Sequence, residues 1–257
     1  MKLDFQEKIT LKTCYIASCV FTSRFPSLSL QIRNYVKDRF GCEIVRCCVP
    51  KYKILDFEER MPEGKYRDLW RELPDSEQFS PGDDVYSLCH NCNNIIEEMH
   101  PGVRVRSLWE LLDADDEFPF PDYQGMKVTI QDCWRSRDRQ EEQFAVRSLL
   151  EKMNIEFVEA ELNHENTEFC GASLYRPQPP RNPKLAPKHY AEGVEGKFLP
   201  HTAEEQEQLM IDYCRQFKTD KVVCYCHYCL EGLLMGKVEG IHIARLLFSP
   251  EDFLPQH

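Results

Sequence analysis

The sequence predicts an α/β fold of two pseudo-symmetric cysteine-rich halves, each a small, mostly parallel sheet flanked by helices. Short apolar runs typical of strands alternate with longer helix-like segments, which is the pattern of parallel sheets covered by helices. Cysteines also occur twice in the same order along the 257 residues. We therefore expect a first half over residues 1–118 and a second half over residues 119–257.

An internal repeat supports this division. Several landmarks recur in the same order and at nearly constant intervals, and each CxxC motif follows a short apolar run and precedes helix-like sequence. Self-similarity that keeps its spacing over several landmarks indicates two copies of one unit. The landmarks are Cys19 and Cys133, Arg33 and Arg147, and the CxxC motifs at 89–92 and 226–229.

The individual elements follow from local patterns. In the first half, Cys14–Ser18 and Val85–Leu88 are expected strands. In the second half, a β-rich run predicts a strand over Lys127–Gln131, and apolar residues at helical spacing predict a helix over Arg139–Met153. A strand is expected over Ile155–Val158. A capping box at Thr202-Ala-Glu-Glu205 predicts a helix that runs to about Phe217.

Two segments stand apart from the repeat. Residues 113–124 contain two prolines and five acidic residues, so we expect a solvated linker or surface loop. The second half also carries a proline-rich insertion at 175–200 with a basic character. Such a stretch is extended and lacks helix potential. It is either a surface excursion or a lid or partner-docking arm over the second cysteine set.

Composition and charge restrict the class of protein. A net charge of −11 argues against a phosphate-binding surface, so we expect no nucleic-acid partner. No apolar run approaches the roughly 18–20 residues that span a bilayer, and the first residues lack the apolar core of a secretory signal. We therefore expect a cytoplasmic protein. Thirteen cysteines in a reducing compartment point to a metal or an iron–sulfur cluster rather than to disulfides.

Most of these cysteines stand at the ends of predicted strands. Since the carboxyl ends of parallel strands meet at one edge of a sheet, we expect the cysteines of each half to converge there. The helix that starts after each CxxC favours thiolates and the negative charge of a cluster. The candidate ligands are Cys19, Cys47, Cys48, Cys89 and Cys92 in the first half and Cys133, Cys170, Cys226 and Cys229 in the second.

A cysteine, an adjacent pair and a CxxC, in that order and repeated, resemble the cysteine-rich CCG domain found in the catalytic subunit of heterodisulfide reductase and its relatives. The likeness extends to the segments 18–26, 132–133, 169–172 and 242–247, and it covers about residues 13–248. It implies that the five cysteines of the first half hold a noncubane [4Fe–4S] cluster, with Cys47 and Cys48 as the catalytic pair. The implied activity is electron transfer to a disulfide or related acceptor.

The second half departs from that family pattern because Phe169 stands where the first cysteine of the pair is expected. Four thiolates remain, which suffice for a cubane [4Fe–4S] cluster or for tetrahedral zinc but not for the five-ligand assembly. Cys224 is a substitute fifth ligand only if its strand stays regular. Cys14, Cys42 and Cys214 are expected in the core.

Several alternatives stay open. His90 and His227 either supply a hydrogen bond near a cluster or are exposed loop histidines, and Arg33 and Arg147 either lie near the clusters or cap a sheet edge. A zinc-stapled scaffold or binding module and a pure electron-relay subunit of a larger dehydrogenase are the alternative functions. Because the chain lacks a GxGxxG fingerprint, flavin or another electron-donating iron–sulfur group is expected on a partner subunit.

Overall fold

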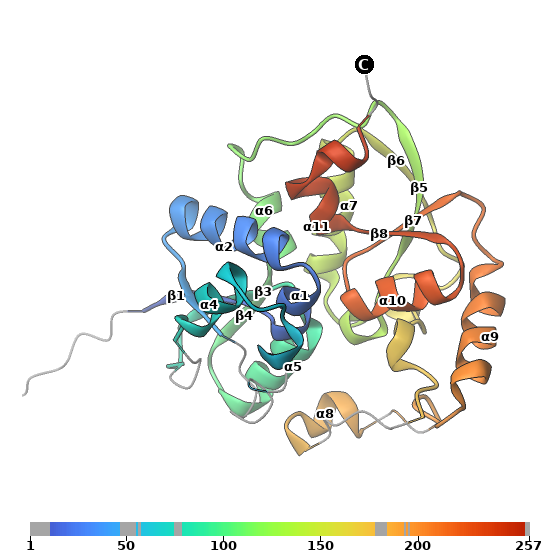
Figure 1. The fold of residues 1–257 in the computed structure, drawn as a ribbon, viewed down its shortest axis with the longest axis horizontal. Helices are drawn as coiled ribbons and strands as arrows, with labels where there is room; N and C mark the ends of the chain where they lie inside the picture. Colours follow the sequence, from blue (N-terminus) through green and yellow to red (C-terminus); the bar gives the residue numbers. More distant parts are fainter. Residues whose placement is uncertain are drawn as a thin grey trace, which may run out of the picture.

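The computed structural model describes residues 11–46, 55, 58–74, 79–177, 184–192, 194 and 196–254. Within these ranges the predicted α/β class is confirmed: two four-stranded, entirely parallel sheets are flanked by helices (Figure 1). The first half contains β1 (Thr13–Ile16), α1 (Cys19–Arg24), α2 (Pro26–Phe40), β2 (Glu43–Val45), α4 (Lys65–Arg71), β3 (Asp84–Ser87), α5 (His90–Met99), β4 (Arg104–Ser107) and α6 (Leu108–Asp113).

The second half repeats this plan with short 3₁₀ helices, labelled η, near its cysteines. Its elements are β5 (Met126–Gln131), η1 (Trp134–Ser136), α7 (Gln140–Lys152), β6 (Ile155–Glu159), η2 (His164–Asn166), η3 (Gly171–Ser173), α8 (Pro187–Tyr190), α9 (Ala203–Cys214), β7 (Lys221–Cys224), α10 (His227–Met235), β8 (Glu239–His242), α11 (Ile243–Phe248) and η5 (Pro250–Asp252). The strands and helices expected for this half are therefore present. The helix that starts at the capping box ends at Cys214, earlier than expected.

Both sheets have the same strand order, β2-β1-β3-β4 and β6-β5-β7-β8. The chain moves outward from the first strand to the second and then returns to the other side of the first strand. The carboxyl ends of the two central strands therefore lie next to each other at the switch point, where open parallel sheets bind ligands. In both halves, cysteines follow these two strands directly.

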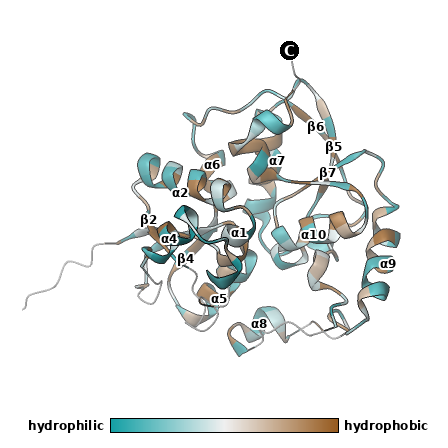
Figure 2. Cartoon of the chain, in the orientation of Figure 1, coloured by the Kyte–Doolittle hydropathy of each residue, from teal (hydrophilic) through white to brown (hydrophobic). Residues whose placement is uncertain are grey.

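The central strands are short and strongly buried, as expected for parallel sheets covered on both faces. Residues Cys14–Ile16 of β1 and Val222–Cys224 of β7 are each at most 2% exposed. The covering helices are amphipathic, and Figure 2 shows hydrophobic and hydrophilic turns alternating along α9. Among the described residues, no helix is both long and apolar enough to cross a membrane.

The two halves share one hydrophobic core. In each half the helix after the fourth strand packs on the first long helix of the other half, so α6 contacts α7 and α11 contacts α2. At this interface the rings of Trp109 and His242 lie 5.9 Å apart. One apolar cluster runs continuously through both halves.

The connection between the halves is the expected surface loop, because residues 114–124 contain no helix or strand and most of them are exposed or half-buried. Asp115 is an exception: it is 3% exposed, accepts a hydrogen bond from the Tyr35 hydroxyl and pairs with Arg39 at 2.8 Å. Phe118 and Tyr123 are also buried. The acidic composition did not predict these buried positions, because a carboxylate that receives a guanidinium and a phenol can be buried.

Residues 184–192 of the proline-rich insertion, which we call the strap, lie against α5 of the first half (Figure 1). The strap contains α8, a short helix that the composition did not predict, with Pro187 at its start. The Glu98 carboxylate accepts hydrogen bonds from the backbone N–H groups of Lys188 and His189, at 3.1 and 3.0 Å. The strap therefore joins the second half to the first.

Candidate metal centre

The four predicted cysteine ligands of the second half converge. Cys133 follows β5, Cys170 precedes η3, Cys226 is the N-cap residue of α10 and Cys229 lies in its first turn. The Cys133 thiol interacts electrostatically with the other three thiols, and its sulfur atom lies within 4.8 Å of that of Cys226. None of the four residues is more than 3% exposed. Three separate chain segments thus bring four sulfur atoms into one buried cluster.

The environment makes two of the four thiols acidic. Hydrogen bonds from Cys133 and Cys229, together with the nearby His90, hold the pKa of Cys226 well below its usual value. Burial opposes ionisation of Cys170, but a hydrogen bond from Cys133 and the charge of Arg135 lower its pKa to about 7. Burial raises the pKa of the other two thiols. The surroundings therefore favour the charged form of two of the four sulfur atoms, and a metal would bind the sulfur atoms as thiolates and displace their protons.

Arg135 supplies positive charge beside this cluster. It lies in η1, is 3% exposed and donates to the Ser173 hydroxyl at 3.1 Å and to the Asn91 side-chain oxygen. Its guanidinium carbon lies 5.2 Å from the ring centres of both Tyr190 and Tyr228. No local pattern in the sequence pointed to this residue, because its partners come from the strap, from α10 and from the CxxC of the first half.

A buried carboxylate anchors the loop that carries Cys133. Asp132 pairs with Arg147 at 2.7 Å and also accepts from the Tyr225 hydroxyl at 2.7 Å and from the His164 backbone N–H at 2.8 Å. Arg147 also forms a salt bridge with Glu159 of β6 at 2.6 Å. Arg147 therefore fits both alternatives: it forms a salt bridge with the edge strand β6, and it holds the residue before Cys133.

The first-half cysteines within the described residues occupy the matching places. Cys19 is the first residue of α1, Cys89 is the N-cap residue of α5 and Cys92 lies in its first turn; all three are buried. Cys47 and Cys48 lie outside the described residues. Burial raises the pKa of Tyr228, with contributions from the charges of the nearby Cys89 and Cys19. A residue of the second CxxC thus lies beside the first cysteine set.

The two CxxC histidines are not exposed loop residues, since both are 1% exposed. His90 packs edge-on against Tyr225 of the second half, with ring centres 5.5 Å apart. Burial favours the neutral form of His90, but the Glu142 carboxylate and Cys226 outweigh it and raise the pKa to about 10. Burial lowers the pKa of His227 to about 4.

The remaining cysteines are structural. Cys14, Cys42 and Cys214 are buried, and burial raises the pKa of each thiol to about 11. The Cys224 thiol donates to the Cys226 carbonyl oxygen at 3.7 Å. That contact gives Cys224 a role at the end of β7 and does not favour it as a fifth ligand.

A polar pocket of about 570 Å³ opens near the contact between α6 and α7. Its lining is mostly charged, and it includes Glu142, whose Oε2 is buried without a hydrogen-bond partner among the described residues. Glu142 thus lines the pocket and also contacts His90. Its charged lining residues are Glu97, Arg106, Glu110, Asp138, Arg139, Glu141 and Glu142.

No protein-family model matches the chain, and it has no significant match among the curated proteins. The likeness to the CCG domain therefore stays a prediction that rests on the cysteine pattern. The geometry of the second-half cluster stands independently of it.

Proposed function

We propose that the chain is an iron–sulfur oxidoreductase subunit whose second half holds a [4Fe–4S] cluster on Cys133, Cys170, Cys226 and Cys229. The observation that carries the proposal is the meeting of these four buried thiols from three chain segments. Thiolates are the ordinary ligands of iron–sulfur clusters, which supply one-electron redox chemistry when bound.

The surroundings of the four thiols fit such a negatively charged group. Arg135 offers a buried positive charge next to Cys170 and Cys133. The α10 helix starts at His227, directly after Cys226, and its N-terminus favours negative charge. Two of the thiols are already acidic through their protein surroundings. These features lower the cost of holding several thiolates together in the interior.

The smaller number of cysteines favours an electron-relay role for the second half. Burial does not separate the halves, because Cys19, Cys89 and Cys92 are also at most 4% exposed, but only the first half has the five cysteines that the resemblance assigns to a noncubane cluster. In our proposal, disulfide chemistry belongs to the five-cysteine set of the first half, Cys19, Cys47, Cys48, Cys89 and Cys92. Electrons would come from a partner iron–sulfur or flavin subunit.

A structural zinc site is the second candidate function. Four buried cysteines are also the usual ligand set of closed, structural zinc sites. In that case the second half is a zinc-stapled module, and the chain acts as a scaffold. Zinc has no visible absorption, whereas iron–sulfur clusters are brown.

The test is purification of the full chain without oxygen, with iron, sulfide and zinc quantified per chain. We expect brown protein that contains iron and sulfide, and an unusual paramagnetic signal that Cys47→Ser or Cys48→Ser removes. Cys229→Ser should lower the iron content, whereas the matched control Cys214→Ser, a buried thiol outside the cluster, should not. Colourless protein with stoichiometric zinc would favour the second candidate, and a chain that binds neither metal would overturn both.

A further inference from the structure

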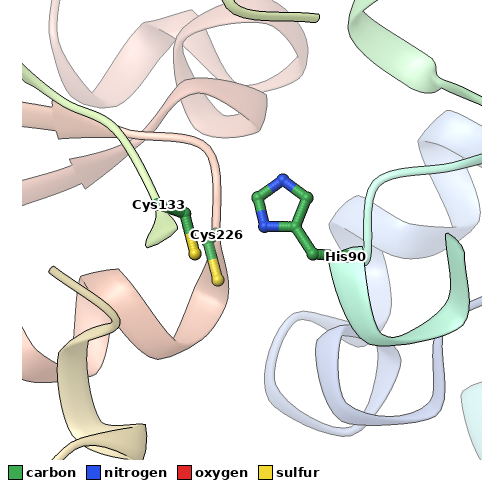
Figure 3. A group of neighbouring side chains, drawn as sticks. All are labelled: His90, Cys133 and Cys226. Atoms are coloured by element: carbon green, nitrogen blue, oxygen red, sulfur yellow. The ribbon is translucent and has the colours of Figure 1, made fainter. Parts of the chain in front are cut away.

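His90 belongs to the CxxC of the first half, but its imidazole lies at the cysteine cluster of the second half. Figure 3 shows the ring facing the sulfur atoms of Cys133 and Cys226. A ring nitrogen of His90 and these two sulfur atoms all lie within 4.8 Å of one another. All three side chains are buried. Donor atoms from both halves can therefore reach a single metal ion.

The contact with Glu142 determines which ring nitrogen of His90 can bind a metal. Nε2 of His90 lies 3.2 Å from Oε1 of Glu142, a carboxylate of α7 with no exposed surface. A carboxylate accepts, so Nε2 carries a hydrogen, and a metal would bind at Nδ1, where it would displace the proton that the raised pKa keeps on the metal-free ring. Nδ1 is buried and has no hydrogen-bond partner among the described residues. A carboxylate behind the second nitrogen is the usual companion of a metal-binding histidine.

The ring is also held from the side of the cysteines. Tyr225 packs edge-on against His90, with an interplanar angle of 85°. The hydroxyl of the same tyrosine donates to Asp132, the residue before Cys133, at 2.7 Å. The positions of the imidazole and of the Cys133 loop are thus fixed by one network. Such support is what a metal ligand requires, because its geometry must survive loss of the metal.

The equivalent histidine of the second half differs. His227 is equally buried, but its two ring nitrogens have no hydrogen-bond partner in the described part of the chain. Within that part, it also belongs to no group of three or more metal-binding side chains. His227 therefore lacks the carboxylate and the paired sulfur atoms that surround His90, and it serves as an internal comparison.

We propose that His90 is a metal ligand of the second-half centre, which thus draws donor atoms from both halves. This inference rests on the proposed function only in requiring that the thiols hold a metal. A cubane cluster or a tetrahedral zinc ion takes four protein ligands, so His90 would bind beside Cys133 and Cys226 in place of one of the four cysteines, whereas a five-ligand assembly would use all five residues. The same imidazole suits iron or zinc, because both metals accept mixed sulfur and nitrogen ligands.

The test uses the full chain in a Cys89→Ser, Cys92→Ser background, which removes first-half ligands. One sample is reconstituted with iron and sulfide after labelling with ¹⁵N-histidine, then reduced and studied by pulsed electron paramagnetic resonance. A second sample is loaded with zinc and studied by X-ray absorption. We expect a directly bound histidine nitrogen in the first, and in the second a nitrogen at about 2.0–2.1 Å beside sulfur at about 2.3 Å.

Substitutions show which histidine gives the nitrogen signal. His90→Ala should remove the nitrogen signature, and the matched control His227→Ala should keep it. His90→Cys should retain the metal with sulfur in place of nitrogen, which covers the case that His90→Ala does not fold. Metal bound by sulfur alone in the parent, or a nitrogen signature that survives in His90→Cys, would overturn the inference and leave the proposed function standing. A parent that binds no metal would overturn both.

Discussion

Gly232 of α10 lies directly against Gly171 of η3: a methyl group placed on Gly232 would stand 2.5 Å from the Cα atom of Gly171. Gly171 itself has a left-handed φ of 51°, and a methyl group there would lie 1.9 Å from the Tyr228 carbonyl oxygen. The Cys170 loop can therefore rest on the helix that carries Cys229 only because both positions are glycine.

Gly232→Ala should lower both stability and metal content. Helix propensity alone would make alanine more favourable by about 1 kcal/mol. The collision with Gly171 reverses the sign, and we expect a loss of about 1–3 kcal/mol in the free energy of unfolding. Because the Cys170 loop must lift from α10, iron or zinc per chain should also fall. Anaerobic chemical unfolding and metal analysis measure the two effects.

Leu234→Ala is the matched control, since Leu234 is 54% exposed on the same helix. Exposed substitutions usually change stability by no more than about 0.5 kcal/mol, so its metal content should stay at the parent level. A Gly232→Ala protein that is more stable than the parent and fully loaded would contradict the close approach.

Phe169 occupies the position of the missing cysteine with a stacked aromatic ring. Its ring lies 4.4 Å from that of Tyr213, with planes 13° apart. Phe169→Ala should therefore cost about 3–5 kcal/mol. Phe169→Cys loses the same packing but adds a thiol at the pair position, and we expect a second noncubane-type paramagnetic signal, in addition to that of the first half, in the cysteine variant only. Normal iron content with an unchanged spectrum would mean that the local backbone does not support a fifth thiolate.

Local sequence patterns were sufficient for the fold and for bringing Cys133 and Cys226 together, whereas the ligand set itself stays a prediction. The alternation of elements and the repeated intervals reflect local periodicity and duplication, which a single sequence records. The ends of β5 and β7 then had to meet, and Cys133 and Cys226 with them. The strand order of the sheet therefore predicted that these cysteines meet.

Contacts across the interface could not be predicted in the same way. His90 meets Cys226 and Glu142 only because the two halves pack with α6 on α7. Arg135 likewise depends on Tyr190, which the strap delivers from a segment whose composition indicated no helix. Packing between distant segments decides these positions, and no periodicity in the chain encodes it.

The strap should open when Glu98 is lost. Glu98 accepts from two strap backbone N–H groups, and its Oε1 lies 2.6 Å from Nδ1 of His189. Hydrogen bonds to a charged group contribute about 1.5–3 kcal/mol each, and each 1.4 kcal/mol corresponds to a tenfold change. We expect Glu98→Ala to speed amide hydrogen exchange in residues 184–192 at least about tenfold.

Lys188→Ala provides the control for the strap, because it removes a side chain but keeps the backbone N–H that Glu98 binds. Its exchange rates should match those of the parent. Equal rates in the parent and in Glu98→Ala would show that other contacts, such as buried Tyr190, hold the strap in place.

His242 makes stability depend on pH. It ends β8, accepts the Ala244 backbone N–H on Nδ1 at 3.3 Å and has no exposed surface. Its ring lies 5.2 Å from that of Phe21 in the first half. Burial and, to a lesser degree, the neighbouring His227 lower its pKa to about 3 from 6.5. The folded protein therefore keeps this histidine neutral at pH values where the unfolded chain protonates it.

The direction of the pH effect follows from this lowered pKa. Well above pH 6.5, His242 is neutral in both the folded and the unfolded state, so it does not reduce the free energy of unfolding. As the pH falls below 6.5, the unfolded state takes up the proton first and stability is lost progressively toward pH 3. Between about pH 7.5 and pH 5.5, this residue should account for a loss of about 1.4 kcal/mol.

We expect His242→Gln to remove that part of the pH dependence. Unfolding free energies from urea titrations at the two pH values should differ by about 1.4 kcal/mol less in the variant than in the parent. Trp109→Phe is the control: its ring packs beside His242, so it should lower stability at both pH values and leave the difference between them unchanged. Because both variants keep all the candidate ligands, loss of metal in acid affects the compared proteins alike. If the parent and His242→Gln lose the same stability on acidification, His242 is not the titrating group.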